Sequence, residues 1–446
     1  ERVTLQGTGW PSGVALVARL YAAENPSGPG ADMTGVFQAS VDGHFTVQAV
    51  VPTTLVTGVS RGNLAVVPGS YTIAVRSSPD LVVSTPFSVG APTRAGLLWG
   101  EVWIDYNASG QRDSGDRAAG ELALVIIAGP DPSVQERVAR TDGRGRFLAV
   151  PLLPGIYQLT ARVRLQEVDL QATATISVQA GQALQADLLL RPAPIDSTRP
   201  GCFIDTGYCI EHDPFWRFFL ARGGVDTFGY PVSRTILFLG CTTQFFQRQL
   251  LQQCGGGPVQ TMNLLDPDLM PYSQINFSVF PAHDPAVATA APPPGTPNYG
   301  VAVLAYIQRT APDSFEGLPV RFFTTFVTTV PGVDPGTEPA LAALVNLELW
   351  GFPTSRPAYD PSNRNFVYQR FQRGILHYDH SNRVTRGILL ADWFKSILTG
   401  QQLPADLAQQ AQGSRFFRQY CPGSPQWVCR PAELPATDLT FAFEPQ

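Results

Sequence analysis

Between residues 100 and 116 the chain reads Gly-Glu-Val-Trp-Ile-Asp-Tyr-Asn-Ala-Ser-Gly-Gln-Arg-Asp-Ser-Gly-Asp. From Asp105 onward, side chains that carry oxygen fall at loop positions 1, 3, 5, 9 and 12, and position 6 is a glycine, which permits a sharp turn. Calcium takes about six to eight oxygen ligands, and this spacing wraps one chain around the ion. The pattern therefore predicts calcium as a cofactor, with the ligands Asp105, Asn107, Ser109, Gln111 (through its carbonyl), Asp113 and Asp116.

The last position of this loop departs from the usual pattern. It is Asp116, where such loops carry a bidentate glutamate, and the shorter side chain offers the ion a single oxygen. We therefore expect a dissociation constant on the order of 10⁻⁴ to 10⁻³ M, as in extracellular modules. The alternative is a hairpin turn of Asp, Asn and Gly that needs no ion.

The loop lies in the second of two β-rich segments with the same pattern. Residues 1–91 and residues 95–192 each contain an Asp-Gly turn, a phenylalanine at the start of the next strand and then Pro-Gly-x-Tyr before a further strand. The matching aromatic residues are Phe45 and Tyr71 in the first segment and Phe147 and Tyr157 in the second. This pattern predicts two antiparallel β-sandwiches, so the expected fold class is mainly β with several domains.

Together with the loop, these motifs resemble the SdrD B-like domain of bacterial surface adhesins over residues 95–192. The resemblance implies an Ig-like sandwich that binds calcium and acts as a rigid spacer. It implies the same six metal residues as the loop spacing, and residues 1–91 are expected to form a similar Ig-like sandwich.

A different repeat occupies residues 200–400. Phe228-Gly-Tyr-Pro-Val-Ser-Arg234 and Trp350-Gly-Phe-Pro-Thr-Ser-Arg356 are each followed by Phe-Gln-Arg, at 246–248 and at 371–373. These copies resemble LGFP-type repeats of secreted actinobacterial proteins, and this resemblance implies an association with the cell envelope. The first copy departs from that pattern because Gln249 stands where the second has Gly374. The region 200–446 as a whole looks like a type of extracellular protein common in Chloroflexi.

The resemblance implies two small α+β LGFP-like modules at 200–282 and 300–400. Residues 283–299 are rich in Pro, Ala and Thr and are expected to form a linker, and 401–446 are expected to form an irregular tail held by a disulfide.

The six cysteines form three couples that are close in sequence, namely Cys202 with Cys209, Cys241 with Cys254, and Cys421 with Cys429. An even count at short spacings predicts disulfides in an oxidising compartment. Zinc is the alternative, but no couple has the C-x-x-C spacing. The chain begins at Glu1, which fits a mature exported form, and no apolar stretch approaches 18 residues, so no membrane span is expected. These observations predict an extracellular protein at the cell surface.

Charge and motifs exclude two classes of function. The formal net charge is −5 without a basic run, so nucleic-acid binding is not expected. The sequence has no G-x-S-x-G, H-E-x-x-H or phosphate loop, so we expect a non-enzymatic protein. The densest polar cluster, His377-Tyr-Asp-His380, is either a metal site or, more simply, a solvated turn.

The leading hypothesis is a subunit of a surface filament or surface layer that self-associates through exposed strands. The candidate assembly residues are Arg2, Val3, Leu5, Leu439, Phe441 and Phe443. The rivals are a monomeric adhesin that binds envelope polysaccharide and the non-catalytic part of a secreted enzyme. The candidate aromatic platform for sugar rings consists of Trp216, Trp350, Phe352 and Tyr359, and the alternative is that these residues form the small core of the modules.

Overall fold

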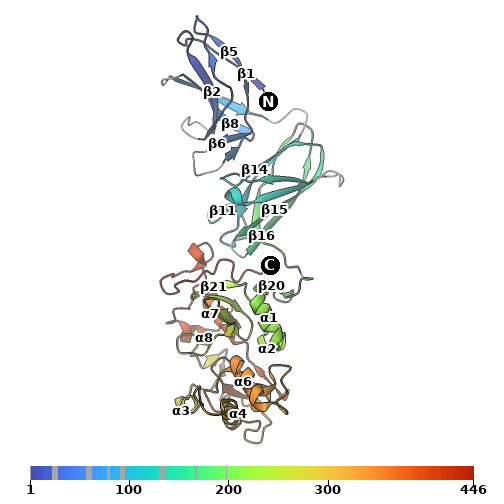
Figure 1. Cartoon of the computed structure of the whole chain (residues 1–446), viewed down its shortest axis with the longest axis vertical. Helices are drawn as coiled ribbons and strands as arrows, with labels where there is room; N and C mark the ends of the chain where they lie inside the picture. The colour runs from blue at the N-terminus through green and yellow to red at the C-terminus, as the bar shows by residue number, and fades with distance from the viewer. Residues whose placement is uncertain are drawn as a thin grey trace. The chain divides into compact units, whose positions relative to one another are not determined.

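The computed structural model describes residues 2–22, 29–56, 63–77, 81–90, 96–129, 136–165, 168–196 and 198–445. The chain divides into two compact units, Glu1–Ala193 and Pro194–Gln446 (Figure 1). The fold is mainly β, as predicted, and it contains several separate sheets. Within the described residues, no helix combines the length and the hydropathy that crossing a membrane requires.

The first part of the N-terminal unit consists of two sheets with a core between them. In the smaller sheet β1 pairs antiparallel with β5 along its whole length, and the larger sheet has the order β7-β6-β3-β2-β8-β9, with β4 also paired to β2. Both sheets contribute to one buried cluster, which includes Phe45 and Ala49 of β5 and Leu20 and Ile73 of the larger sheet. The strands are β1 (Arg2–Gly7), β2 (Ala15–Ala22), β3 (Gly30–Asp32), β4 (Phe37–Gln38), β5 (Phe45–Val50), β6 (Thr54–Val56), β7 (Asn63–Ala65), β8 (Gly69–Ser77) and β9 (Val82–Val89).

The second part of this unit is a nine-stranded sheet around β10. Its longest pair is the hairpin β15–β16, in which Gly155 lies opposite Val178 and Leu165 opposite Val168. The prediction of purely antiparallel pairing is wrong at one place, because β10 runs parallel to β17 and to β18. The elements are β10 (Gly96–Ile104), β11 (Arg117–Ala118), η1 (Gly120–Leu122), β12 (Leu124–Ala128), β13 (Arg137–Arg140), β14 (Arg146–Leu152), β15 (Gly155–Leu165), β16 (Val168–Val178), β17 (Ala183–Gln185) and β18 (Leu188–Pro192).

The repeated Pro-Gly-x-Tyr pattern has the same local structure in both β segments. The hydroxyl of Tyr71 donates to the carbonyl of Val67 at 2.9 Å, and the hydroxyl of Tyr157 donates to the carbonyl of Leu153 at 3.0 Å. Both tyrosines are buried, so each hydroxyl needs a partner, and the turn four residues upstream supplies it. The sequence repeat therefore marks a repeated structural device.

The C-terminal unit contains two four-stranded antiparallel sheets, β21-β22-β23-β24 and β27-β28-β29-β30, one from each sequence copy. Its strands are β19 (Cys202–Phe203), β20 (Tyr208–Cys209), β21 (Ile236–Phe238), β22 (Cys241–Phe245), β23 (Leu250–Gln253), β24 (Gln260–Thr261), β25 (Gln274–Ile275), β26 (Ser278–Val279), β27 (Ala358–Tyr359), β28 (Phe366–Arg370), β29 (Ile375–Asp379) and β30 (Val384–Gly387). Its helices are α1 (Asp213–Ala221), α2 (Gly224–Phe228), α3 (Pro285–Thr289), α4 (Tyr299–Thr310), α5 (Phe322–Thr328), α6 (Pro339–Trp350), α7 (Leu390–Thr399), α8 (Ala405–Ala411) and η2 (Pro425–Trp427).

The glycine of the G-[FY]-P-x-S motif ends a helix at the same place in each copy. Gly229 has φ +75° and Gly351 has φ +67°, and a Cβ at either position would lie 2.6 Å from the Cβ of Gln247 or Gln372. These values favour glycine, both because φ is positive and because no space remains for a side chain.

The glutamine beside each of these glycines holds the motif in place. Gln247 Oε1 accepts the N–H of Tyr230 at 3.1 Å, and Gln372 Oε1 accepts the N–H of Phe352 at 2.9 Å. The motif serine hydroxyls complete the pattern, because Ser233 accepts the N–H of Phe245 and Ser355 that of Arg370, each at 2.9 Å. The motif thus ties a helix end to the sheet of its own copy.

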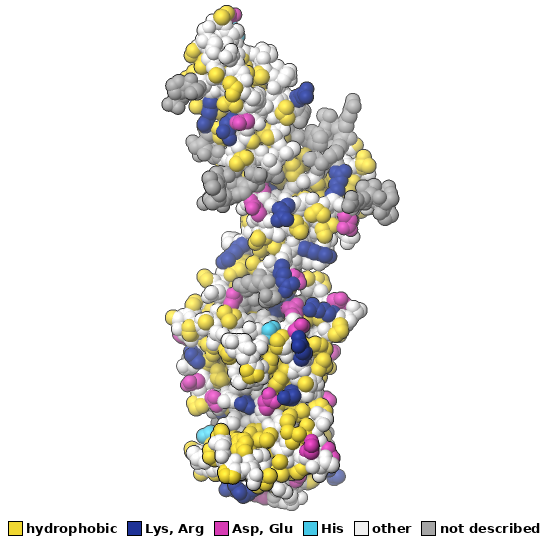
Figure 2. All heavy atoms as spheres, viewed as in Figure 1, with side chains coloured by type: hydrophobic (Ala, Val, Ile, Leu, Met, Phe, Trp, Pro, Cys, Tyr) yellow, Lys and Arg dark blue, Asp and Glu magenta, His cyan; other side chains and the backbone are white. Residues whose placement is uncertain are grey.

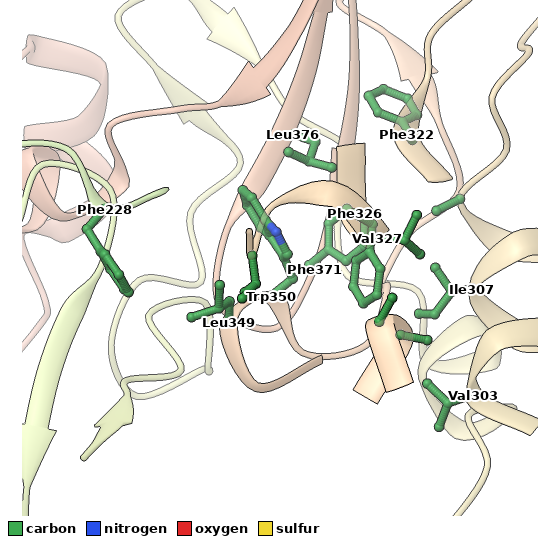
Figure 3. Packing of buried hydrophobic residues seen from close by; sticks show 14 of the residues in the cluster. Phe228, Val303, Ile307, Phe322, Phe326, Val327, Leu349, Trp350, Phe371 and Leu376 are labelled. Atoms are coloured by element: carbon green, nitrogen blue, oxygen red, sulfur yellow. The ribbon is translucent and has the colours of Figure 1, made fainter. Parts of the chain in front are cut away.

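The two copies share one hydrophobic core instead of forming separate modules. One buried cluster includes Phe228 and Phe246 of the first copy and Trp350 and Phe371 of the second (Figure 3). The stretch 283–299, which we expected to be a linker, contains helix α3, and its Val287 is buried in the same unit. The boundaries that the sequence suggested at 282 and 300 therefore do not separate two cores.

The C-terminal segment packs against the first copy, which corrects one of our predictions. Leu439, Phe441 and Phe443 are 0%, 1% and 7% exposed, and residues 440–443 form turns. The N–H of Asp438 donates to Leu237 at 2.8 Å, and the N–H of Arg234 donates to Ala442 at 2.9 Å. The alternating apolar side chains that suggested a donor strand instead fill the core beside β21 and β22, so this segment is not available to pair with another subunit.

Candidate functional site

The predicted calcium loop connects β10 to β11 in the N-terminal unit. Asp105 directly follows β10, is 3% exposed, and its N–H donates to Leu190 of β18 at 3.0 Å. Its carboxylate accepts the N–H groups of Ser109, on Oδ1, and Gly110, on Oδ2, each at 3.0 Å. Gly110 has φ +80°, so the mid-loop glycine adopts the left-handed conformation that the turn requires.

A basic side chain already neutralises this first loop carboxylate. Arg191, on β18, places Nε 3.2 Å from Asp105 Oδ2, and its Nη2 donates to the carbonyl of Gly110. The sequence pattern did not reveal this arginine, because it lies 86 residues beyond Asp105 in the chain and reaches it only through the parallel pairing of β18 with β10.

The remaining loop residues are held by hydrogen bonds among themselves. Asp113 Oδ1 accepts the N–H of Gly115 at 2.7 Å and the Nδ2 of Asn107 at 2.8 Å. The Gly115 N–H, then the Ser109 hydroxyl and the Asn107 amide hold the pKa of Asp113 below its ordinary value. The Ser109 hydroxyl also donates to the carbonyl of Gln111 at 2.7 Å. The four predicted ligands in this network are therefore close together in space.

Asp116 is the last residue of the loop, and only one of its two carboxylate oxygens accepts a hydrogen bond within the described residues. Its Oδ2 accepts the N–H of Asp113 at 2.9 Å, whereas its Oδ1 is buried without a hydrogen-bond partner in the part of the chain that the structure describes. The loop atoms that could bind a metal are all oxygens, the ligand class that calcium prefers. The Oδ1 of Asp116, which has no hydrogen-bond partner among these described residues, fits a cation ligand. Among the described residues, no three acidic, histidine or cysteine side chains are arranged as a metal site, and Arg191 must move for Asp105 to ligate.

The four aromatic residues of the proposed sugar platform pack against the core of the C-terminal unit. Trp350, which is labelled in Figure 3, is 5% exposed. Its Nε1–H donates to the hydroxyl of Thr329 at 3.0 Å. Trp216 stacks on Phe219, and Phe352 and Tyr359 are partly buried against the same cluster. The platform prediction is wrong for Trp350, which is buried, and it stays a prediction for Trp216, Phe352 and Tyr359, which are partly buried.

The three predicted disulfides are confirmed: Cys202–Cys209, Cys241–Cys254 and Cys421–Cys429. Each one joins segments that are close in sequence, and all of them lie in the C-terminal unit.

The polar cluster at 377–380 is divided between a strand and a turn. His377 lies on β29, where its ring faces Phe366 and Tyr368, and burial lowers its pKa to about 4. Asp379 accepts the N–H of Ser381 at 2.9 Å and caps the turn that follows. This arrangement is the solvated turn of the simpler interpretation, with one histidine held neutral at its base.

Sequence reasoning missed a cavity beside α7, whose volume is about 310 Å³ and whose lining includes Asp392 and Trp393. A second cavity of about 440 Å³ lies beside the calcium loop, between Trp103 and Arg191. Basic, acidic and hydrophobic side chains are interspersed on the face drawn in Figure 2.

Comparisons with known proteins give no family for this chain. No family model matches it, and no curated protein matches it. Among solved structures, a Pseudomonas aeruginosa protein provisionally named as carbohydrate-binding is similar, with 14% identity over 22% of this chain and 91% of that chain and a TM-score of 0.16. The group B streptococcus pilus 2b backbone protein is 9% identical over 43% and 92%, with a TM-score of 0.17. A minor pilin of Streptococcus agalactiae is 13% identical over 43% and 89%, with a TM-score of 0.16.

Proposed function

We propose that this chain is a non-catalytic structural protein of the bacterial cell surface, a subunit of an extracellular filament or surface layer. Its three disulfides fit an oxidising compartment outside the cytoplasm. The two β segments with the same tyrosine device fit a chain built from repeated Ig-like spacers, the second being SdrD B-like. The C-terminal unit fits a fused pair of LGFP-type repeats, because both copies use the same Gly, Gln and Ser contacts.

The observation that carries self-association is the outer edge of β1. This six-residue strand contains no proline and pairs with β5 on one side, and within the described residues no strand pairs with its other side. A free edge presents unpaired N–H and C=O groups that a strand of a second copy can complete. Of the predicted assembly residues, Arg2, Val3 and Leu5 lie on this strand. Strand β9 is also an edge, but Pro86 lacks an N–H, and this interrupts its row of donors.

Calcium binding in the Asp105–Asp116 loop is part of this proposal. The loop oxygens would hold the ion and fix the connection between β10 and β11, which would stiffen the second β segment. The orphaned Oδ1 of Asp116 supports this assignment.

The test is negative-stain microscopy of the secreted full chain, first in calcium and then in EDTA. Ordered filaments or sheets that loosen on chelation are expected, and isolated particles in both conditions would contradict the proposal in favour of a monomeric adhesin. Two neighbouring substitutions, Val3→Pro and Thr4→Pro, sharpen the test. Successive N–H groups of a strand point to opposite sides, so one variant removes a donor toward β5 and the other removes a donor at the free edge. The variant that removes the donor at the free edge should abolish assembly, while the first part of the N-terminal unit stays folded.

A further inference from the structure

The outer face of α7 carries a set of side chains that the packing of the fold does not use. The inner face of this helix is fully buried, through Leu390, Ala391, Phe394, Ile397 and Leu398. A stripe on the opposite face starts at Leu389 and continues three, four and seven residues later with Asp392, Trp393 and Ser396. The cavity of about 310 Å³ opens along this stripe and continues to Gln401 and Gln402 beyond the helix. We call it the α7 pocket.

The carboxylate of Asp392 has no hydrogen-bond or ion-pair partner among the described residues of the C-terminal unit. Across residues 198–445, which are described without a gap, it makes no hydrogen bond or ion pair, and burial raises its pKa to about 6, against the opposing effect of Lys395. The ammonium of Lys395 is engaged elsewhere, because it donates to the carbonyl of Val232 at 2.8 Å and lies over the rings of Tyr208 and Phe443. A half-buried carboxylate without a partner destabilises a fold, so a ligand is a physical reason to retain it.

Trp393 differs from the tryptophans of the core. Trp350 donates its N–H to Thr329 and packs on Phe371, and Trp216 stacks on Phe219. Over the same described range, the indole of Trp393 makes neither a hydrogen bond nor a ring contact, although the ring lines the pocket and is half-buried. An indole that presents an apolar face and a free N–H suits a ligand that also has an apolar face and polar edges.

We infer that the α7 pocket binds the end of a saccharide built of pyranose rings. The face of Trp393 would stack on the C–H face of a sugar ring, and the Asp392 carboxylate would accept hydrogen bonds from ring hydroxyls. The side chains of Ser396, Gln401 and Gln402 can each both donate and accept, as a polyol requires. The volume lies at the lower end of the range for small-ligand pockets, about 300 to 1,000 Å³, so the site takes a chain end and not a long chain.

A small organic cation is the competing ligand, since a carboxylate and an indole attract one. Lys395 argues against it, because its positive charge lies close enough to act on the Asp392 carboxylate and would repel a second cation there. This inference goes beyond the structural role proposed above, and it does not depend on whether the chain assembles.

The test is calorimetric titration of the full-length chain with cellotetraose, maltotetraose and tri-N-acetylchitotriose, and with tetramethylammonium as the cation probe. We expect binding of at least one saccharide, weakened at least about tenfold by Trp393→Ala and also weakened by the isosteric Asp392→Asn. Phe277→Ala is the matched control, because Phe277 is 77% exposed in the same unit and lies outside the pocket, and it should bind as the wild type does. Thermal unfolding of each variant checks that the unit remains folded.

Three results would overturn the inference. They are no heat with any of the three saccharides, equal saccharide affinity in Trp393→Ala and the wild type, and binding of tetramethylammonium alone. Because Asp392→Asn changes no volume, it tests the pocket even if Trp393→Ala perturbs the helix.

Discussion

The side-chain amide of Gln249 donates a hydrogen bond to the main-chain carbonyl of Leu349, 2.8 Å away and 100 residues further along the chain. Gln249 is the residue at which the first repeat departs from the second, which has Gly374 at the same place. A Cβ at Gly374 would lie 2.8 Å from the ring of Trp350, so the second copy needs a glycine where the first uses a long side chain to reach its neighbour. The two copies therefore differ at this position in a way that suits the contact between them.

Replacement of Gln249 should weaken the contact between the copies. We expect Gln249→Ala, and also Gln249→Gly, to lower the free energy of unfolding by about 1–3 kcal/mol, because the carbonyl of Leu349 stays buried without its donor. Chemical denaturation measures the loss. The exposed Gln409→Ala on α8 is the control and should change stability little. An unchanged midpoint in both Gln249 variants would show that the bond contributes nothing to stability.

Loss of Phe441 should destabilise the C-terminal unit of an isolated chain. This side chain is 1% exposed, and its ring lies 4.6 Å from that of Trp427, so Phe441→Ala should cost about 3–5 kcal/mol. Deletion of residues 437–446 should have a larger effect, and thermal unfolding in dilute solution measures both. Phe277→Ala should leave the melting temperature unchanged. A deletion that melts like the wild type would return this segment to the role of an assembly strand.

Arg191 should compete with calcium for Asp105. Its Nε lies 3.2 Å from Oδ2, so an ion at Asp105 must displace the guanidinium. We expect Arg191→Gln to raise calcium affinity about tenfold, since a nearby positive charge is removed, and Asp105→Asn to abolish binding. Calorimetric titration measures both. Arg164→Gln makes the same change in net charge outside the loop and should have no effect. No heat from the wild type or from Arg191→Gln at millimolar calcium would remove calcium from the proposal.

Asp392 should make stability depend on pH. Burial raises its pKa from 3.8 to about 6, so between about pH 4 and pH 6 the folded state holds a proton that the unfolded chain has lost. Stability therefore falls as pH rises through this window, and the charged form lowers it by about 1–3 kcal/mol at pH 7. Asp392→Asn should restore that amount at pH 7, and the difference from wild type should vanish near pH 4.

Denaturation at several pH values from 4 to 7 checks this expectation. Asp268→Asn, at an exposed position of the same unit, is the control and should leave the profile unchanged. If the Asp392→Asn and wild-type profiles stay parallel over the whole range, the carboxylate has no raised pKa. If Asp392→Asn is more stable than the wild type and binds saccharide less well, the destabilising carboxylate of Asp392 serves ligand binding.

The features that could be predicted from sequence are those set by neighbours in the chain. The disulfides close short loops, and the two tyrosines bond to carbonyls four residues upstream, so their spacing is visible as a pattern. The left-handed glycine at position 6 of the calcium loop belongs to the same class.

The features that sequence reasoning missed are set by tertiary contacts. Nothing near Asp105 in the chain indicates Arg191, and the spacing of Leu439, Phe441 and Phe443 fits an edge strand as well as a folded-back segment. Trp350 and Trp393 each fit either a core or a surface position by residue type, and packing alone distinguishes them. The stripe at 389, 392, 393 and 396 was the available signal for the α7 pocket, because these positions alternate with a fully apolar helix face.

The bond from the hydroxyl of Tyr208 to the carbonyl of Phe443 spans 235 positions and joins the start of the C-terminal unit to its last residues. During synthesis, the aromatic surface of the first copy therefore stays uncovered until the segment that contains Phe443 has been made. Contacts this distant in sequence slow folding, and the waiting surface is prone to aggregation. A chain cut short before this segment would leave that surface uncovered, which makes the contacts of residues 437–443 a checkpoint on the integrity of the whole unit.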